Sequence, residues 1–369
     1  MAGEGPPSTT GGPGADKGVD GGPPPAMTAR GRWFPSDDTD ISSQPLIPVS
    51  IVTGFLGSGK TTLIGRILRD PGFGRTAVIV NEFGEVPLDH DLIASADDSV
   101  LTLNTGCLCC AIQTDLAKTL LDLLQRRAAG AVEYDRVLIE TSGLSDPAPI
   151  LQSMIGDSAV ALTHAAPSVV TVVDTVHGLQ TLREHDTART QIAVADAILF
   201  SKTDLQPPPG DLIGQLAALN PNAPRATTAQ PTAASLFAAA PAGDRAQRLA
   251  DLPRQPAHAG IDTFTLLRDH PIPALALTML LQAVAEHCGT RLLRMKGLVS
   301  IAEMPGQPAA IHGVRHVVST PVFLDRWPST DTRTRIVFIT KGVPQYFVSR
   351  LLDAIETEVR EETRAASRG

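Results

Sequence analysis

The feature that most constrains this chain is a glycine-rich segment from Gly54 to Thr61. It reads GFLGSGKT and matches G-x-x-x-x-G-K-[ST], and it follows an apolar stretch and precedes a helical pattern, the context that the motif requires. In such a loop the backbone N–H groups surround the phosphates of a nucleotide, and the helix N-terminus adds partial positive charge. The segment therefore predicts a P-loop, with a glycine-rich turn that binds no ligand as the alternative.

The side chains of this loop have separable roles. Lys60 is expected to reach the β and γ phosphates, and the Thr61 hydroxyl is expected to ligate Mg²⁺. The nucleotide-binding residues predicted here are Gly54, Phe55, Leu56, Gly57, Ser58, Gly59, Lys60, Thr61 and Thr62.

A second phosphate-side element is predicted at the end of another strand, where RVLIE is followed by TSG at residues 136–143. Glu140 is expected to orient the Mg²⁺ shell or the attacking water, and the Gly143 N–H is expected to contact the γ-phosphate and report its loss. Alone, an aliphatic strand that ends in Glu is equally consistent with an exposed strand end, but the P-loop favours the functional reading. The predicted catalytic residues are Lys60, Thr61, Glu140 and Gly143.

Base choice is assigned to Ser201, Lys202, Thr203 and Asp204, which follow an apolar strand where an N-K-x-D guanine reader would stand. Guanine presents two donors on its N1 and N2 edge, and a carboxylate accepts both. Asp204 is therefore the predicted specificity residue, and the stem of Lys202 is expected to lie along the ring. Ser201 replaces the usual Asn, which predicts the loss of an amide that braces the site. A plain surface turn is the alternative.

Three of the four cysteines lie within four positions, at Cys107, Cys109 and Cys110. This layout is poor for a disulfide framework. The cluster precedes a predicted helix, whose N-terminus lowers thiol pKa and favours thiolates that bind Zn²⁺ or a similar ion. A Glu, a His or a second protomer is expected to complete the ligand shell, with Glu82 and Glu85 as the acidic candidates. Redox-sensitive or packed thiols are the alternative.

Short aliphatic runs alternate with helical patterns from Leu46 onward, which predicts an α/β domain with a mostly parallel sheet. Helices are expected at Thr61–Arg69 and Thr114–Arg127. The expected strands are Val49–Thr53, Ala77–Val80, Ser99–Leu103, Arg136–Glu140, Ser168–Val173 and Ala197–Phe200.

The remaining chain divides by composition. Residues 1–44 are rich in Gly, Pro, Ser and Asp and are expected to be a disordered tail, with Met27 as an alternative start. Residues 45–230 are assigned to the P-loop domain and 231–260 to a linker. Residues 261–369 are expected to form a smaller α+β domain of one sheet and two helices. Its predicted elements are strands Asp262–Leu266, Gly297–Ile301, Ala309–Val314 and Arg335–Ile339, and helices Ala274–Cys288 and Val343–Glu361.

Charge and hydropathy exclude two classes of partner. The net charge is −8, so no basic field exists to bind a nucleic acid by counterion release. No apolar run reaches the roughly 20 residues that span a bilayer. A cytoplasmic protein is expected.

Together these motifs resemble the CobW-like metal-handling GTPases, relatives of the nickel-insertion GTPases for urease and hydrogenase. The C-x-C-C order is quite specific to that family. The resemblance runs through the P-loop and the segments 81–85, 106–110, 140–147, 201–204, 292–297 and 337–339, together with Trp327.

The resemblance implies a GTPase that binds zinc or cobalt through its cysteines and passes the ion to a client metalloprotein. It also implies that residues 81–85 are a first switch loop and that Asp174 continues the nucleotide pocket, and it leaves a homodimer open. Many members carry a histidine-rich stretch, whereas the nine histidines here are scattered, which argues against bulk metal storage.

Two other functions remain open from the sequence. One is a P-loop kinase acting on a small molecule, although no acceptor-binding segment is recognisable. The other is a metal- or redox-sensing binding protein in which the nucleotide only stabilises the fold.

Overall fold

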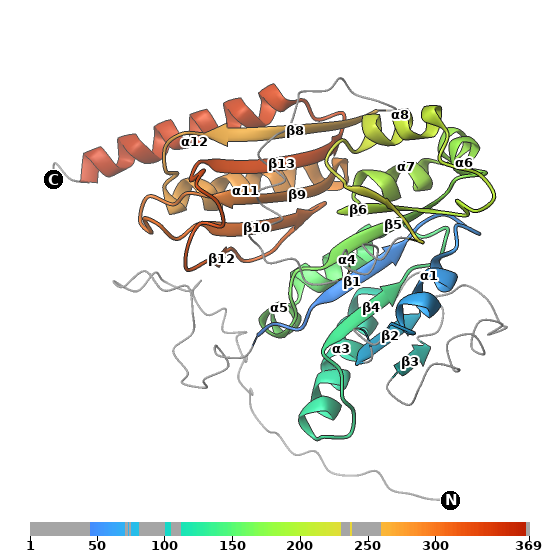
Figure 1. Ribbon diagram of the computed structural model, residues 1–369. Helices are drawn as coiled ribbons and strands as arrows, with labels where there is room; N and C mark the ends of the chain where they lie inside the picture. Colours follow the sequence, from blue (N-terminus) through green and yellow to red (C-terminus); the bar gives the residue numbers. More distant parts are fainter. Residues whose placement is uncertain are drawn as a thin grey trace, which may run out of the picture. The chain divides into compact units, whose positions relative to one another are not determined.

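A seven-stranded sheet, parallel at every pairing, carries the P-loop (Figure 1). The computed structural model describes residues 45–70, 73, 75–80, 100–104, 112–229, 237 and 260–366. The strand order is β3-β2-β4-β1-β5-β6-β7. The strands are β1 Val49–Thr53, β2 Thr76–Val80, β3 Val100–Asn104, β4 Arg136–Glu140, β5 Ser168–Asp174, β6 Ala197–Ser201 and β7 Arg225–Thr227.

Helices cover both faces of this sheet, as the continuous apolar strands require. Side chains alternate along a strand, so Val52 packs with Leu63 and Ile64 of one helix, whereas Ile51 belongs to the core on the opposite face. The helices are α1 Lys60–Ile67, α3 Ile112–Ala128, α4 Ala148–Gly156, α5 Ser158–Thr163, α6 Gly178–Glu184, α7 Asp186–Ala193 and α8 Gly210–Leu219. The predicted α/β P-loop fold is confirmed.

A second, antiparallel sheet follows, in the order β11-β10-β9-β13-β8, with β12 paired to β10 (Figure 1). Helices α11 and α12 supply the apolar side chains that complete its core, so the predicted α+β arrangement is also confirmed. The elements are β8 Ile261–Arg268, α11 Ala274–Cys288, the 3-10 turn η2 Gly289–Arg291, β9 Leu292–Val299, β10 Ala309–Val314, β11 Val317–Val318, β12 Val322–Phe323, β13 Thr334–Lys341 and α12 Gln345–Ala366.

One strand was predicted in the wrong place. The expected strand Gly297–Ile301 is in fact β9, which begins five residues earlier. Arg294 and Lys296 interrupt its apolar pattern, and both side chains form ion pairs with Asp196. Paired charges can therefore stand in a strand that the hydrophobic pattern does not mark.

The helices described here include none that is both long and apolar enough to span a lipid bilayer.

Candidate nucleotide site

The residues predicted to bind a nucleotide lie at one edge of the parallel sheet. The P-loop follows β1, while Glu140, Asp174 and Ser201 are the last residues of β4, β5 and β6. Because these strands are neighbours and parallel to β1 or to β5, their carboxyl ends meet at the same edge. This is the edge at which open α/β sheets bind ligands.

The P-loop backbone depends on glycine. Gly54, Gly57 and Gly59 all have positive φ angles, of 142°, 68° and 90°. A Cβ on Gly54 would lie 2.3 Å from the carbonyl oxygen of Val172, so no side chain fits there. The loop ends at Gly59, which caps α1 without a side-chain hydrogen bond. A helix N-terminus that no capping side chain occupies is the arrangement that an anion site requires.

Two phosphate-side contacts connect the P-loop to its surroundings. The buried ammonium of Lys60 donates to the carbonyl oxygens of Gly54 at 3.0 Å and Phe55 at 3.3 Å. The Thr61 hydroxyl donates to Oε1 of Glu140 at 2.8 Å, and Glu140 is only 1% exposed. A hydroxyl beside a buried carboxylate is an oxygen donor set that suits Mg²⁺. The structure thus brings together three of the four predicted catalytic residues.

The fourth, Gly143, lies against the P-loop. A Cβ at this position would be 2.6 Å from the backbone nitrogen of Leu56, so only glycine allows this approach. The buried amide of Gln191, in α7, donates to the carbonyl oxygens of Gly143 at 3.2 Å and Ser145 at 3.0 Å. Sequence reasoning did not identify Gln191, and a single glutamine in a helix gives no signal that it holds a loop 48 residues earlier in the chain.

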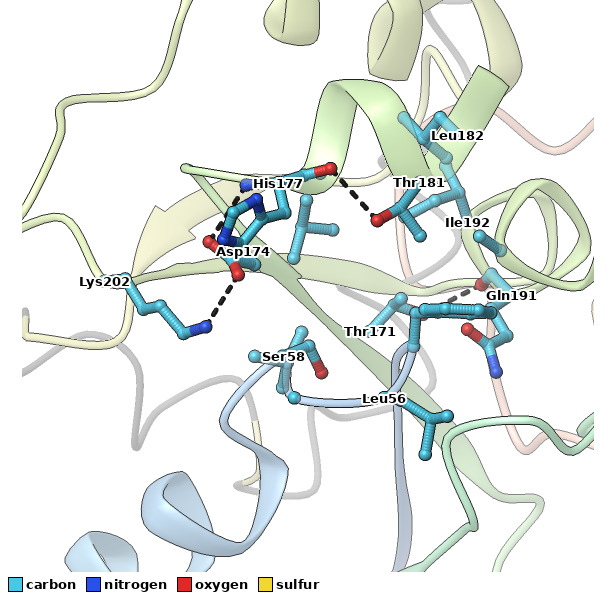
Figure 2. A pocket seen from close by; sticks show the side chains of 16 residues that line it. Leu56, Ser58, Thr171, Asp174, His177, Thr181, Leu182, Gln191, Ile192 and Lys202 are labelled. Carbon is cyan, nitrogen blue, oxygen red and sulfur yellow. Dashed lines mark hydrogen bonds and ion pairs between the residues drawn. The ribbon is translucent and has the colours of Figure 1, made fainter. Parts of the chain in front are cut away.

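The predicted base reader is fixed by an ion pair. Figure 2 shows the Lys202 side chain extended towards Asp174, with Nζ 2.7 Å from Oδ2. Burial alone would raise the pKa of Asp174, but hydrogen bonds from Lys202 and from the N–H groups of Val176 and His177 outweigh it and lower the pKa. The carboxylate therefore stays ionised and holds the lysine in place.

Ser201 makes a contact that the sequence did not predict. It lacks the amide of the usual Asn, and its hydroxyl donates to the backbone oxygen of Ser58 at 2.6 Å. The end of β6 is thus tied directly to the P-loop. Because a hydroxyl is shorter than an amide, the close approach of β6 and the loop allows this contact.

A pocket of about 260 Å³ lies between the P-loop and the residues that follow β5 (Figure 2). Its wall includes Leu56, Ser58, Asp174 and Lys202, so it adjoins the base reader. Beside it the ring of Phe55 stacks on His185 with centroids 4.4 Å apart. The pocket extends from the predicted nucleotide-binding residues towards α6 and α7.

The remaining predicted residues divide into two groups. Thr62 is exposed in the first turn of α1, Thr203 is half-buried, and Asp204 is exposed in the turn after β6. The proposed metal ligands Cys107, Cys109, Cys110, Glu82 and Glu85 lie outside the described residues. Within the ranges that the structure describes, no three His, Cys, Asp or Glu side chains gather to hold a metal ion.

Two sequence profiles match the chain. The CobW/HypB/UreG nucleotide-binding domain matches residues 48–226, and the cobalamin synthesis protein CobW C-terminal domain matches residues 261–356. The two matches coincide with the parallel and the antiparallel sheet.

Several proteins with similar sequences have names that refer to zinc. The zinc chaperone YjiA of Escherichia coli is 39% identical over 178 residues, which cover 48% of this chain and 56% of YjiA. The zinc chaperone CobW of a Sinorhizobium species is 28% identical over 82% of this chain and 94% of its own length. The zinc-regulated GTPase metalloprotein activator 1 of Saccharomyces cerevisiae is 32% identical over 48% of this chain and 46% of its own. The chain thus spans about half the length of two of these curated relatives.

Among solved structures, the zinc-bound YjiA GTPase of Escherichia coli has the same fold. The two structures superpose with a TM-score of 0.58 at 24% identity, covering 85% of this chain and 99% of YjiA. This likeness extends the match with YjiA over both sheets.

Proposed function

Because the chain belongs to the CobW/HypB/UreG nucleotide-binding family and carries a CobW C-terminal domain, we propose that it is a GTPase that chaperones a metal ion. In this proposal it binds zinc or cobalt through the C-x-C-C motif at Cys107–Cys110 and delivers the ion to a client metalloprotein. The observation that carries the GTPase part is the hydrogen bond of Thr61 to the buried Glu140 beside the start of α1. The names of the relatives support zinc as cargo.

The phosphate chemistry follows from the contacts of the P-loop. Lys60 would turn its ammonium from the Gly54 and Phe55 carbonyl oxygens to the β and γ phosphates. Thr61 and Glu140 would hold Mg²⁺, which supplies charge neutralisation at the phosphates when bound. Glu140 would orient the Mg²⁺ shell or the attacking water, and the Gly143 N–H would face the γ-phosphate. The reaction is the transfer of that phosphoryl group to water, which yields GDP and phosphate.

Guanine selectivity rests on Asp204, with Lys202 against the ring. The ion pair with Asp174 positions Lys202, and the Ser201 hydroxyl couples the reader to the P-loop at Ser58. Base recognition and phosphate binding are therefore linked through short contacts. Such preorganisation lowers the ordering cost that binding must overcome.

The register of the sheet supports a metal site near the phosphates. Val80 at the end of β2 pairs with Asn104 at the end of β3 and with Glu140 at the end of β4. The strands that precede Glu82 and Cys107 in the sequence therefore end beside each other, and β2 ends beside Glu140. We propose that thiolates of Cys107, Cys109 and Cys110, with Glu82 or Glu85, bind the ion, since thiolates select zinc and related metals.

The cysteine assignment predicts a selective loss. Replacing Cys109→Ser removes one thiolate, so zinc affinity is expected to fall at least about tenfold while GTP affinity is unchanged. Competition with a chelating dye measures the first, and nucleotide titration measures the second. Cys288→Ser is the matched control, because Cys288 is buried in the core of the second sheet. Unchanged zinc affinity in the Cys109 variant would remove the motif from the metal site.

One assay separates this function from its rivals. Phosphate release is measured from GTP with Mg²⁺ and no added acceptor. Release above that of a Lys60→Ala variant supports a GTPase. A kinase would release no free phosphate and would form GDP only when an acceptor is added, because the phosphoryl group passes to that acceptor. A nucleotide-stabilised sensor would show no turnover above the variant. Either result would contradict the proposed function.

A further inference from the structure

The loop that follows β4, residues 141–147, is held at its start by the P-loop strand. The Thr141 N–H donates to the Val52 carbonyl oxygen at 3.0 Å, and its hydroxyl donates to the Thr53 hydroxyl at 2.8 Å. Gly143 then lies against Leu56, as described above. The first half of this loop is therefore fixed relative to the phosphate site, and in the described conformation it is closed onto the P-loop.

The far end of the loop is held by a residue from the antiparallel sheet. Oδ1 of Asp146 accepts from the Ala148 N–H at 2.9 Å, at the start of α4. Oδ2 of the same carboxylate accepts from the Arg315 guanidinium, which also forms a salt bridge with it. The two carboxylate oxygens thus make different contacts. One orders the start of α4, and the other ties the loop to the second sheet.

Arg315 occupies a backbone position that arginine rarely adopts. It lies in the two-residue connection between β10 and β11, with a φ angle of 54°, and its N–H donates to the Leu292 carbonyl oxygen at 2.8 Å. Hairpin positions of this kind favour Gly, Asn or Asp. Its side chain is only 26% exposed, and its Nε is buried without a hydrogen-bond partner. A positive φ angle at an arginine whose side chain is paired with Asp146 is the kind of backbone outlier that is found at functional positions.

A second set of ion pairs joins the same two sheets without touching this loop. Arg294 and Lys296 of β9 bind the two carboxylate oxygens of Asp196, each at 2.8 Å. Asp196 lies before β6, at the end of that strand opposite to the guanine reader. A substitution in these pairs therefore disturbs the contact between the two sheets without disturbing residues 141–147.

We propose that Arg315 is a positioning residue of the GTPase. Through Asp146 it holds residues 141–147 closed on the P-loop, so that the second sheet favours the GTP-bound form over the GDP-bound form. The γ-phosphate is the group that distinguishes the two nucleotides, and Gly143 is the residue of this loop that the proposed function assigns to it. By reciprocity, GTP strengthens the contact between the loop and the second sheet by the same factor. This inference rests on the proposed function.

The test compares affinities for GDP and for a non-hydrolysable GTP analogue in the full chain. In Arg315→Gln the affinity for the analogue is expected to fall at least about fivefold relative to the affinity for GDP, which is the lower end of typical coupling. Arg315→Lys keeps the charge and is expected to recover part of the loss. Asp146→Asn keeps the oxygen that accepts from the Ala148 N–H. The double variant Asp146→Asn with Arg315→Gln is expected to lose no more affinity for the analogue than either single variant, because both substitutions remove the same ion pair. Lys296→Gln is the matched control, with an unchanged ratio.

Three outcomes are decisive. If the wild-type chain binds neither nucleotide, the proposed function is wrong and this inference falls with it. If the wild-type chain binds both and the Arg315→Gln ratio is unchanged, the inference alone is wrong. If Lys296→Gln lowers the ratio as much as Arg315→Gln, the effect comes from general packing of the two sheets, which also contradicts a specific role for Arg315.

Discussion

Replacing Lys60→Ala is expected to reduce GTP hydrolysis at least about a hundredfold, as loss of one preorganised charge donor typically does. The Lys60 ammonium is buried and bound to two P-loop carbonyl oxygens, so its charge already lies inside the loop in which the phosphates are proposed to bind. No other side chain can replace it from the same position in the loop. Single-turnover phosphate release with saturating protein measures the effect on the chemical step.

A matched control excludes a general effect of losing a lysine. Lys118 in α3 is exposed, so Lys118→Ala is expected to leave hydrolysis unchanged. The melting temperatures of both variants show whether the loss of the Lys60 hydrogen bonds destabilises the folded protein. Hydrolysis by Lys60→Ala at the wild-type rate would show that the observed turnover does not occur at this P-loop.

Replacing Asp204→Asn is expected to weaken the binding free energy of GTP by about 1.5–3 kcal/mol, the value of a hydrogen bond to a charged group. Asn places a donor where the N1 and N2 edge of guanine also presents donors. Xanthosine triphosphate presents an acceptor in the place of the N2 donor, so its affinity is expected to rise in the variant. Titration of GTP and of xanthosine triphosphate into the wild-type protein and the variant measures this change of base preference.

The control for this exchange is Asp211→Asn, at an exposed position in the first turn of α8. It removes the same charge seven residues later and is expected to change neither affinity. Equal binding of GTP and ATP by the unmodified protein would show that the guanine assignment is wrong.

Sequence predicted the parallel sheet well, because its strands are buried on both faces. The predicted bounds of β1 and β4 agree with the structure, since each is a short apolar run with a polar residue or a turn at its end. The helix Ala274–Cys288 was also predicted with its observed bounds, because Gly289 ends it with a φ angle of 50°. Local signals sufficed at these positions.

The stretch from Ala148 to Ala193 was harder to predict. It contains four short helices, α4 to α7, and nearly every residue of α4 is buried, so its pattern has no polar face to reveal a helical period. At the site, Gln191 and Arg315 were missed because each acts on a loop far away in the sequence. Such contacts depend on the fold as a whole and leave no pattern in the residues around them.

The central proposal is that nucleotide state controls metal binding. It is supported by the strands that precede the proposed metal ligands, because β2 pairs with β3 and with β4, which ends at Glu140. The most direct test measures zinc affinity by competition with a chelating dye, in the GDP form and in a form bound to a non-hydrolysable GTP analogue. A coupling of about 1–3 kcal/mol predicts that the two affinities differ by roughly 5- to 150-fold. Equal zinc affinity in the two nucleotide states would contradict the chaperone mechanism, even if the protein binds zinc and hydrolyses GTP.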